Sequence, residues 1–178
     1  ALGASFDFGS GITAAVGYEG QGNSSKGFLS KQSTDAIGAQ FAYTADNYGV
    51  SLSWANIENH DANNGVKGAT RAMTGDGQTQ SVGINAFYAP DLPNFPSISA
   101  GIETNHDDSV SGTEADQTSH YFVGIQWDEI GNGTLGAALG SKEPYAENGN
   151  ALTMYEVFYS YNYADGITIT PMIYSKDN

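Results

Sequence analysis

The sequence predicts an all-β protein: an antiparallel up-and-down meander of about ten strands that forms a transmembrane β-barrel or part of one. Apolar and polar residues alternate with a period of two in many short segments. The connections between these segments alternate between short and long. No segment places apolar residues at the i, i+3, i+4 and i+7 spacing of an amphipathic helix. Strands with tight turns at one end and long polar loops at the other are typical of membrane barrels.

The alternation defines ten segments, and the residues between them supply the turn chemistry. The predicted strands are Leu2–Phe8, Ile12–Glu19, Ile37–Thr44, Val50–Ile57, Ser81–Ala89, Ser97–Thr104, Gln117–Trp127, Thr134–Gly140, Leu152–Tyr163 and Ile167–Ser175. Short connections such as "GSG", "ADNYG" and "ADG" suit hairpin turns. Long connections hold most of the Lys, Arg and His residues. Each hairpin therefore has one tight end and one polar end.

Aromatic residues gather near the strand ends, and aliphatic residues occupy the strand middles on the same faces. Rings near both ends of an aliphatic band are typical of a barrel wall in lipid, because amphipathic rings prefer the membrane interfaces. An aromatic core in a soluble β-protein would give the same alternation. The predicted girdle near the short turns contains Tyr43, Tyr88, Trp127 and Tyr163, and the girdle near the long loops contains Tyr18, Tyr121, Tyr155 and Tyr174.

Composition narrows the function further. Six Lys and Arg residues against twenty Asp and Glu residues argue against nucleic acid and against an anionic leaflet, which both attract basic patches. The absence of cysteine excludes disulfides, thiolate metal sites and cysteine nucleophiles. No apolar run approaches the 18 residues of a transmembrane helix. The chain shows no signal peptide and does not begin with Met, so we expect a processed chain or a fragment.

The hairpins "YTADNYGVSLSW" and "YNYADGITITPMIYSKDN" resemble the barrel region of cyanobacterial outer-membrane porins, the family described as iron-uptake or carbohydrate-type (OprB-like) porins. The resemblance spans essentially the whole chain. It implies a channel in the cell outer membrane, usually a homotrimer, that passes small hydrophilic solutes and inorganic ions. In that family a peptidoglycan-binding domain and a coiled coil precede the barrel. We therefore expect residues 1–178 to be the C-terminal barrel portion, without those parts and without a closing strand.

Motifs for enzymatic chemistry are weak. "GNGTLG" matches the dinucleotide-binding G-x-G-x-x-G, but the preceding segment alternates and no helix follows, so an Asn-Gly hairpin turn is favoured. The loop "NHDDSVSGTEAD" gathers Asp107, Asp108, Glu114 and Asp116, which are oxygen ligands suited to Ca²⁺, although the spacing is that of an ordinary acidic loop. We expect no metal site, no cofactor and no catalytic residue.

The histidines occur far apart, at His60, His106 and His120, and two of them are predicted in loops and one in the wall. No G-x-S-x-G sequence is present. These observations favour a protein that is not an enzyme.

Charged residues are the candidates for selectivity. Lys67 and Arg71 lie in the longest connection, and Glu103 and Glu156 lie on predicted inward faces. A loop folded into the channel would set these cations against the acids, and such charge rings select ions. A solvated extracellular loop is the alternative. The excess of acid would favour cations over anions in the channel.

The sequence thus predicts passive diffusion of small hydrophilic solutes through an outer-membrane porin. A soluble β-sandwich binding module, such as a lectin-like or receptor-binding domain, is the alternative. It would share the Tyr, Asn and Gly content and the polar loops.

Overall fold

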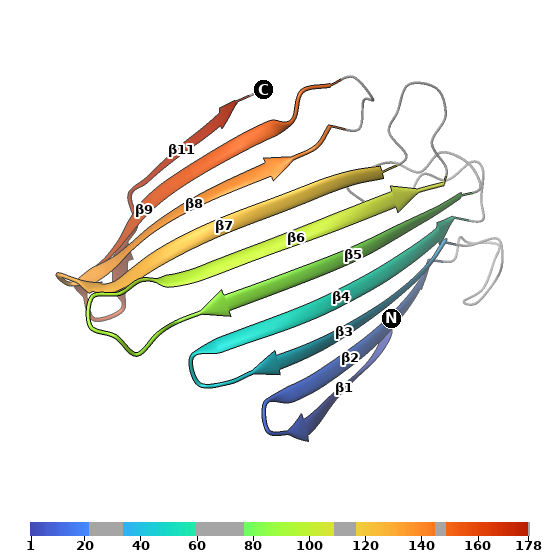
Figure 1. Cartoon of the computed structure of the whole chain (residues 1–178), viewed down its shortest axis with the longest axis horizontal. Helices are drawn as coiled ribbons and strands as arrows, with labels where there is room; N and C mark the ends of the chain where they lie inside the picture. Colours follow the sequence, from blue (N-terminus) through green and yellow to red (C-terminus); the bar gives the residue numbers. More distant parts are fainter. Residues whose placement is uncertain (22–33, 60–76, 109–116, 145–148, 178) are drawn as a thin grey trace.

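The computed structural model describes residues 1–21, 34–59, 77–108, 117–144 and 149–177. These residues form eleven β-strands in one antiparallel sheet (Figure 1). The strands are β1 Leu2–Gly9, β2 Ile12–Gln21, β3 Thr34–Thr44, β4 Tyr48–Asn59, β5 Gly77–Tyr88, β6 Ser97–Asp107, β7 Gln117–Ile130, β8 Gly133–Lys142, β9 Leu152–Ala164, β10 Ile167–Ile169 and β11 Met172–Asp177. No helix in the described part of the chain could span a membrane.

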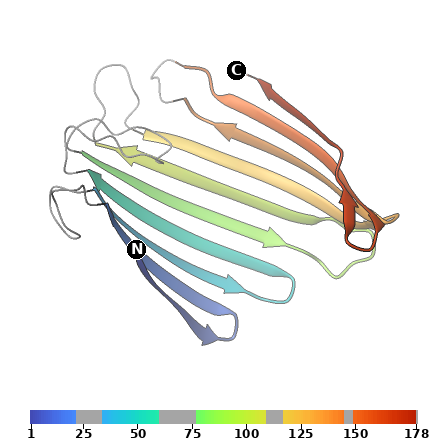
Figure 2. The same ribbon diagram turned by 180° about the vertical axis from the view of Figure 1, so that it is seen from behind.

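The sheet is an up-and-down meander, which confirms the predicted all-β antiparallel architecture. Each strand from β1 to β9 pairs with the next in antiparallel register, and β10 and β11 both pair with β9. Figures 1 and 2 show the sheet from its two sides as a single twisted layer. The sheet is not closed into a barrel, so β1 forms one edge and β10 with β11 the other.

The predicted strand Ile167–Ser175 is divided in two at Thr170 and Pro171. Proline has no N–H to donate to a ladder, so it is confined to positions such as this sheet edge. The pairing register is nevertheless the same on both sides, with Ile169 opposite Tyr161 and Met172 opposite Phe158. The Tyr159 N–H donates to the Pro171 carbonyl at 3.1 Å. The final hairpin is therefore one interrupted pair of strands.

The described hairpin turns lie together at one end of the sheet, which we call the turn end, and the opposite end is the loop end (Figure 1). Gly9 and Gly11 adopt φ values of 76° and 80°, where glycine carries no steric penalty. In "GNGTLG" Gly131 and Asn132 form the hairpin turn between β7 and β8, which confirms the predicted turn, and the remaining residues begin β8. The strands extend beyond their predicted bounds mainly at the loop end, where Asn105, His106 and Asp107 belong to β6.

Cross-strand pairing assigns each residue to one of two faces. The apolar face carries Tyr48, Val50, Leu52 and Trp54 of β4 and the residues paired with them, and the polar face carries Gly49, Ser51, Ser53 and Ala55. One row of the apolar face crosses six strands and is aliphatic up to its last member: Val50, Ala86, Ala100, Val123, Leu139 and Tyr155. The alternation of the separate strands is therefore consistent across the sheet.

The apolar face is the more exposed face. Tyr48, Val50, Leu52 and Trp54 are exposed by 45, 46, 49 and 38%. Their neighbours Ser51, Ser53 and Ala55 are half-buried although they are smaller. Curvature toward the polar face explains this difference, since side chains converge on the concave side of a sheet. In the described residues no second layer covers the apolar face, whereas a soluble domain packs at least two layers around one core.

Three phenylalanines depart from the alternation by lying on the polar face. Each sits opposite a glycine: Phe87 opposite Gly49, Phe122 opposite Gly101, and Phe158 opposite Gly136. A Cβ added to any of these glycines would meet the ring of its partner. The rings thus lie across bare backbone, an arrangement that compensates for glycine in strands. They fill the polar face without requiring an apolar layer above it.

Gly133, at the start of β8, is a position in a strand where we expect a methyl group to be poorly tolerated. A Cβ there would overlap the backbone carbonyl oxygen of Ser160, which cannot swing aside as a side chain can. Gly133→Ala is expected to lower the free energy of unfolding by about 1–3 kcal/mol, measured by urea titration of the full chain in micelles. Gly38→Ala is the control, because its Cβ would lie 3.5 Å from the nearest atom, the Trp54 carbonyl oxygen. Equal changes in the two variants would contradict the crowding at Gly133.

Candidate functional site

The exposed apolar face carries a repeated order of side chains along its strands. In β4 it reads Tyr48, Val50, Leu52 and Trp54, and in β7 it reads Tyr121, Val123, Ile125 and Trp127. Each set begins and ends with a ring and has two aliphatic residues between. At about 3.4 Å per residue, each set extends for about 20 Å along its strand. The strands β2 to β9 contain 10 to 14 residues, which reaches the 9–11 or so that a tilted strand needs to cross a bilayer.

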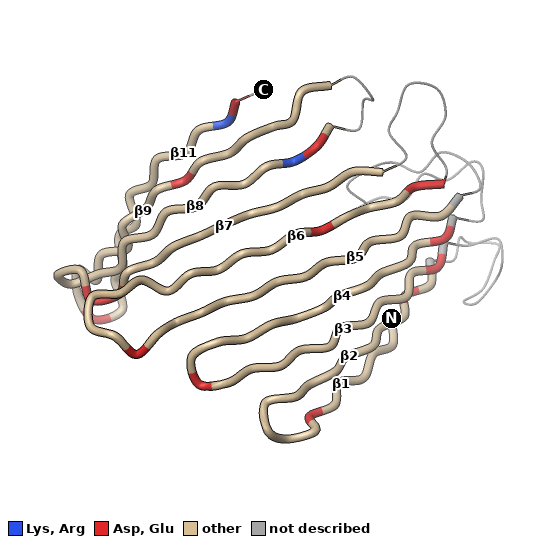
Figure 3. The backbone as a smooth tube through the Cα atoms, viewed as in Figure 1, with Lys and Arg blue, Asp and Glu red and all other residues tan. Residues whose placement is uncertain are grey.

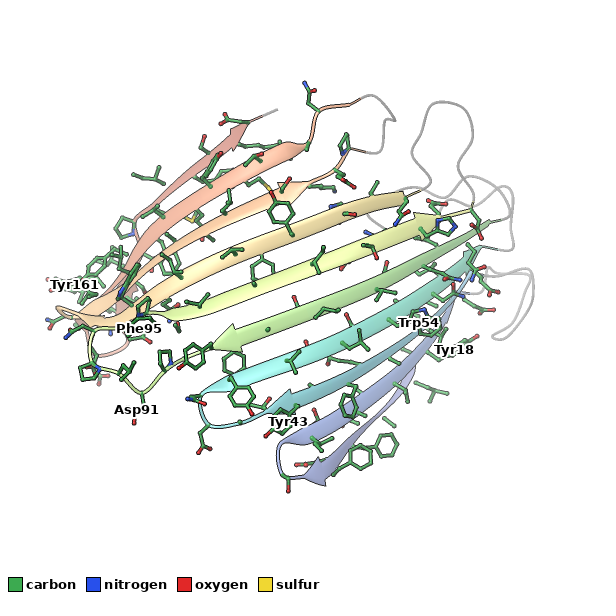
Figure 4. All side chains as sticks on the ribbon, viewed as in Figure 1. Tyr18, Tyr43, Trp54, Asp91, Phe95 and Tyr161 are labelled. Atoms are coloured by element: carbon green, nitrogen blue, oxygen red, sulfur yellow. The ribbon has the colours of Figure 1, made fainter. Side chains whose placement is uncertain are left out.

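Aromatic side chains contact one another at the turn end of the apolar face. The rings of Tyr43 (labelled in Figure 4) and Tyr48 lie 5.8 Å apart, and Tyr48 is paired with Tyr88 across β4 and β5. The Tyr159 hydroxyl donates to the Ile130 carbonyl at 2.6 Å, and its ring stacks on Tyr161 at 6.3 Å. Trp127 of β7 lies on the same face and pairs with Leu135, which in turn pairs with Tyr159.

Polar side chains replace aliphatic ones toward the loop end of the apolar face. Asn56 donates to Glu58 at 3.2 Å and accepts from Gln78 at 2.5 Å. The Tyr18 hydroxyl donates to an Asp35 oxygen at 2.7 Å. The apolar face is therefore a band with a polar boundary. Trp54 lies just inside this boundary and was not among the predicted girdle residues. The signal was present in the sequence, because Asn56 and Glu58, the next two residues on the same face, mark the end of the band.

An imidazole–carboxylate pair lies on the same boundary. His106 of β6 lies 2.8 Å from an Asp108 oxygen. The boundary thus reaches from β2 to the end of β6.

Seven of the eight predicted girdle residues follow the alternation of the apolar face: Tyr18, Tyr43, Tyr88, Tyr121, Trp127, Tyr155 and Tyr163. The eighth, Tyr174, pairs with Glu156 and so lies on the polar face. Ile173, its neighbour, occupies the apolar face instead. The run Met172-Ile173-Tyr174 is apolar at every position, so its alternation gave no indication of which residues face which way.

A row of charged groups crosses the polar face from β6 to β8. Glu103 of β6 is opposite His120 of β7, and His120 is opposite Lys142 of β8. Glu156, on β9, lies on the same face opposite Ala138 and Tyr174. Both predicted acids of the inward face are thus on the polar face, and the structure places His120 and Lys142 beside one of them.

A depression of about 290 Å³ opens over this row. Glu103, His120 and Lys142 line it together with Phe122 and Met154. The buried Nδ1 atom of His120 has no hydrogen-bond partner among the described residues. The sequence missed this grouping because its members come from three strands, and no spacing within one strand connects them.

Several predicted residues lie outside the described part of the chain. These are Lys67 and Arg71, the acids Glu114 and Asp116, and His60. Among the described residues, no three His, Asp or Glu side chains gather in a way that could hold a metal ion. The described half of the acidic loop contains Asp107, which is buried, and Asp108, which pairs with His106.

The described structure thus contains one sheet with two contrasting faces, an exposed band of aliphatic residues between rings and a polar face with a charged depression. No protein-family model matches the chain, and a search of curated proteins gives no significant match.

Proposed function

We propose that the chain forms the wall of an outer-membrane channel for passive diffusion of small hydrophilic solutes and inorganic ions. The observation that carries the proposal is the exposed apolar face, whose aliphatic residues lie between aromatic rings while the opposite face is polar. In lipid the apolar band contacts acyl chains and the rings lie at the interfaces. The polar face then lines water. The function needs no bond to be made or broken, so the protein is not an enzyme.

A wall of this kind has no open edge in the membrane. Each backbone N–H or C=O left unpaired in hydrocarbon costs several kcal/mol. In the proposed assembly β1 and the strands β10 and β11 are therefore paired, either with each other or with further strands. Closure gives a transmembrane β-barrel, and the assembly proposed from the porin resemblance is a homotrimer. The glycines and other small residues of the polar face suit the concave inside of such a wall.

Solute influx tests the channel directly. The full chain, refolded in detergent and incorporated into liposomes, is expected to admit mannitol and to exclude a large dextran. The same preparation is expected to migrate differently on a gel before and after boiling. Empty liposomes and liposomes with boiled protein are the controls.

The alternative, a soluble binding module, makes the opposite prediction. A chain that stays monodisperse in buffer without detergent and leaves liposomes impermeable to mannitol would overturn the channel proposal.

A further inference from the structure

The depression on the polar face has opposite charges on its two sides. Glu103 projects from β6 and Lys142 from β8, with His120 of β7 between them (Figure 3 shows the acid on β6 and the base on β8). Neighbouring strands lie about 4.8 Å apart, so the two charged residues start from backbones about 10 Å apart. A single cation would be repelled by Lys142, and a single anion by Glu103. The row therefore suits a solute that carries both charges.

A free amino acid carries both charges. Its ammonium is repelled by Lys142 but can donate to the Glu103 carboxylate, and its carboxylate can accept a charge-assisted hydrogen bond from Lys142. The volume of about 290 Å³ equals about ten times the 30 Å³ that a water molecule occupies in the liquid. That is enough for an amino acid with a side chain.

From β7 to β9 the row next to the charges is apolar. Phe122 and Met154 line the depression on this side, and Gly140, which pairs with both, leaves the floor between them without a side chain. A Cβ added to Gly140 would make ordinary van der Waals contacts, at 3.5 Å with the Tyr121 carbonyl oxygen and 3.7 Å with the Met154 side chain. An aliphatic side chain can rest on this floor. The ligand chemistry is thus an ammonium, a carboxylate and an apolar group.

We propose that this depression is a binding site for free amino acids with apolar side chains, with Glu103 receiving the ammonium, Lys142 the carboxylate, and Phe122 with Met154 the side chain. The proposal rests on the channel function, in which the site lies on the route of the solute. Under this proposal the channel passes such amino acids in preference to neutral solutes of similar size.

Binding by the full chain in detergent tests the site without using transport. Leucine is compared with 4-methylpentanoate, which lacks the ammonium, and with isoamylamine, which lacks the carboxylate, by calorimetric titration at low salt. Each analogue is expected to bind about tenfold more weakly than leucine, because it loses one charge-assisted hydrogen bond. Equal binding of the three compounds would overturn the proposal.

Three variants locate the site. Glu103→Gln and Lys142→Met are each expected to weaken leucine binding about tenfold, and Gly140→Val is expected to abolish it by filling the floor while leaving both charges in place. Glu19→Gln is the matched control, because Glu19 lies on the polar face at β2, away from the depression. Unchanged binding in all three variants would contradict the site.

Mannitol influx separates this proposal from the channel itself. If mannitol enters liposomes but leucine does not bind, the amino-acid site is wrong and the channel stands. If leucine binds but mannitol stays out, the chain has a binding site and the channel proposal fails.

Discussion

Replacing Leu52 by lysine is expected to remove most of the folded, membrane-inserted protein, whereas Ser51→Lys on the adjacent residue leaves the folded fraction near that of the unmodified chain. Leu52 lies in the middle of the apolar band, between Val50 and Trp54, and is 49% exposed. A lysine at the midplane of a barrel's lipid face costs about 2–4 kcal/mol. Ser51 is on the polar face, where an added lysine contacts water.

The pair of variants distinguishes a membrane wall from a soluble sheet. Exposed positions of a soluble protein tolerate substitution within about 0.5 kcal/mol, so in a soluble module Leu52→Lys would be neutral and would improve solubility. The measurement is the folded fraction after refolding into liposomes, read as gel mobility before and after boiling, together with urea titration. Equal stability of the two variants would contradict lipid contact at Leu52.

A second position tests how far the band extends. Asn56 is on the same face as Leu52 but four residues nearer the loop end, where it forms hydrogen bonds with Glu58 and Gln78. The cost of a lysine on the lipid face of a barrel falls to about 0–1 kcal/mol near the membrane interface. A lysine at Asn56 is therefore expected to be tolerated better than one at Leu52.

The sequence predicted the strands well because each strand carries its own alternation. In β4 and β7 every second residue is apolar along most of the strand, and these residues lie on one face of the sheet. Errors arose where that signal is absent. Asn105, His106 and Asp107 extend β6 although they have the composition of a loop, and Tyr174 lies in a run that is apolar at every position.

Other features depend on register, which no single strand contains. Phe87, Phe122 and Phe158 interrupt the alternation of their own strands and are explained only by the glycine opposite each ring. The row Glu103, His120 and Lys142 likewise exists because three strands pair in one particular register. The long connections between strands leave register open in the sequence, and a shift of one residue would move every side chain to the other face.

Cation preference is the second large effect that we expect, and it depends on where the acids lie. The chain has a formal charge of -14, yet charges outside the channel act on permeating ions only within the screening length. Glu103 and Glu156 lie on the polar face, whereas Asp46 and Asp91 lie in turns at the turn end (Figure 4 labels Asp91). If the polar face lines the channel, Glu103 and Glu156 control selectivity far more than the turn acids do.

Matched double variants separate the two sets of acids. Glu103→Lys with Glu156→Lys, and Asp46→Lys with Asp91→Lys, each change the formal charge by +4, from -14 to -10. At about 0.1 M salt, where the Debye length is about 10 Å, the first double variant is expected to reverse the sign of the reversal potential in planar bilayers, and the second to leave it cation-selective. At about 1 M salt, where that length is about 3 Å, the difference is expected to shrink. Equal shifts of the reversal potential in both double variants would mean that only net charge matters, and would place the selecting field at the mouth of the channel. Anion preference in the unmodified chain would rule out selectivity controlled by the acids.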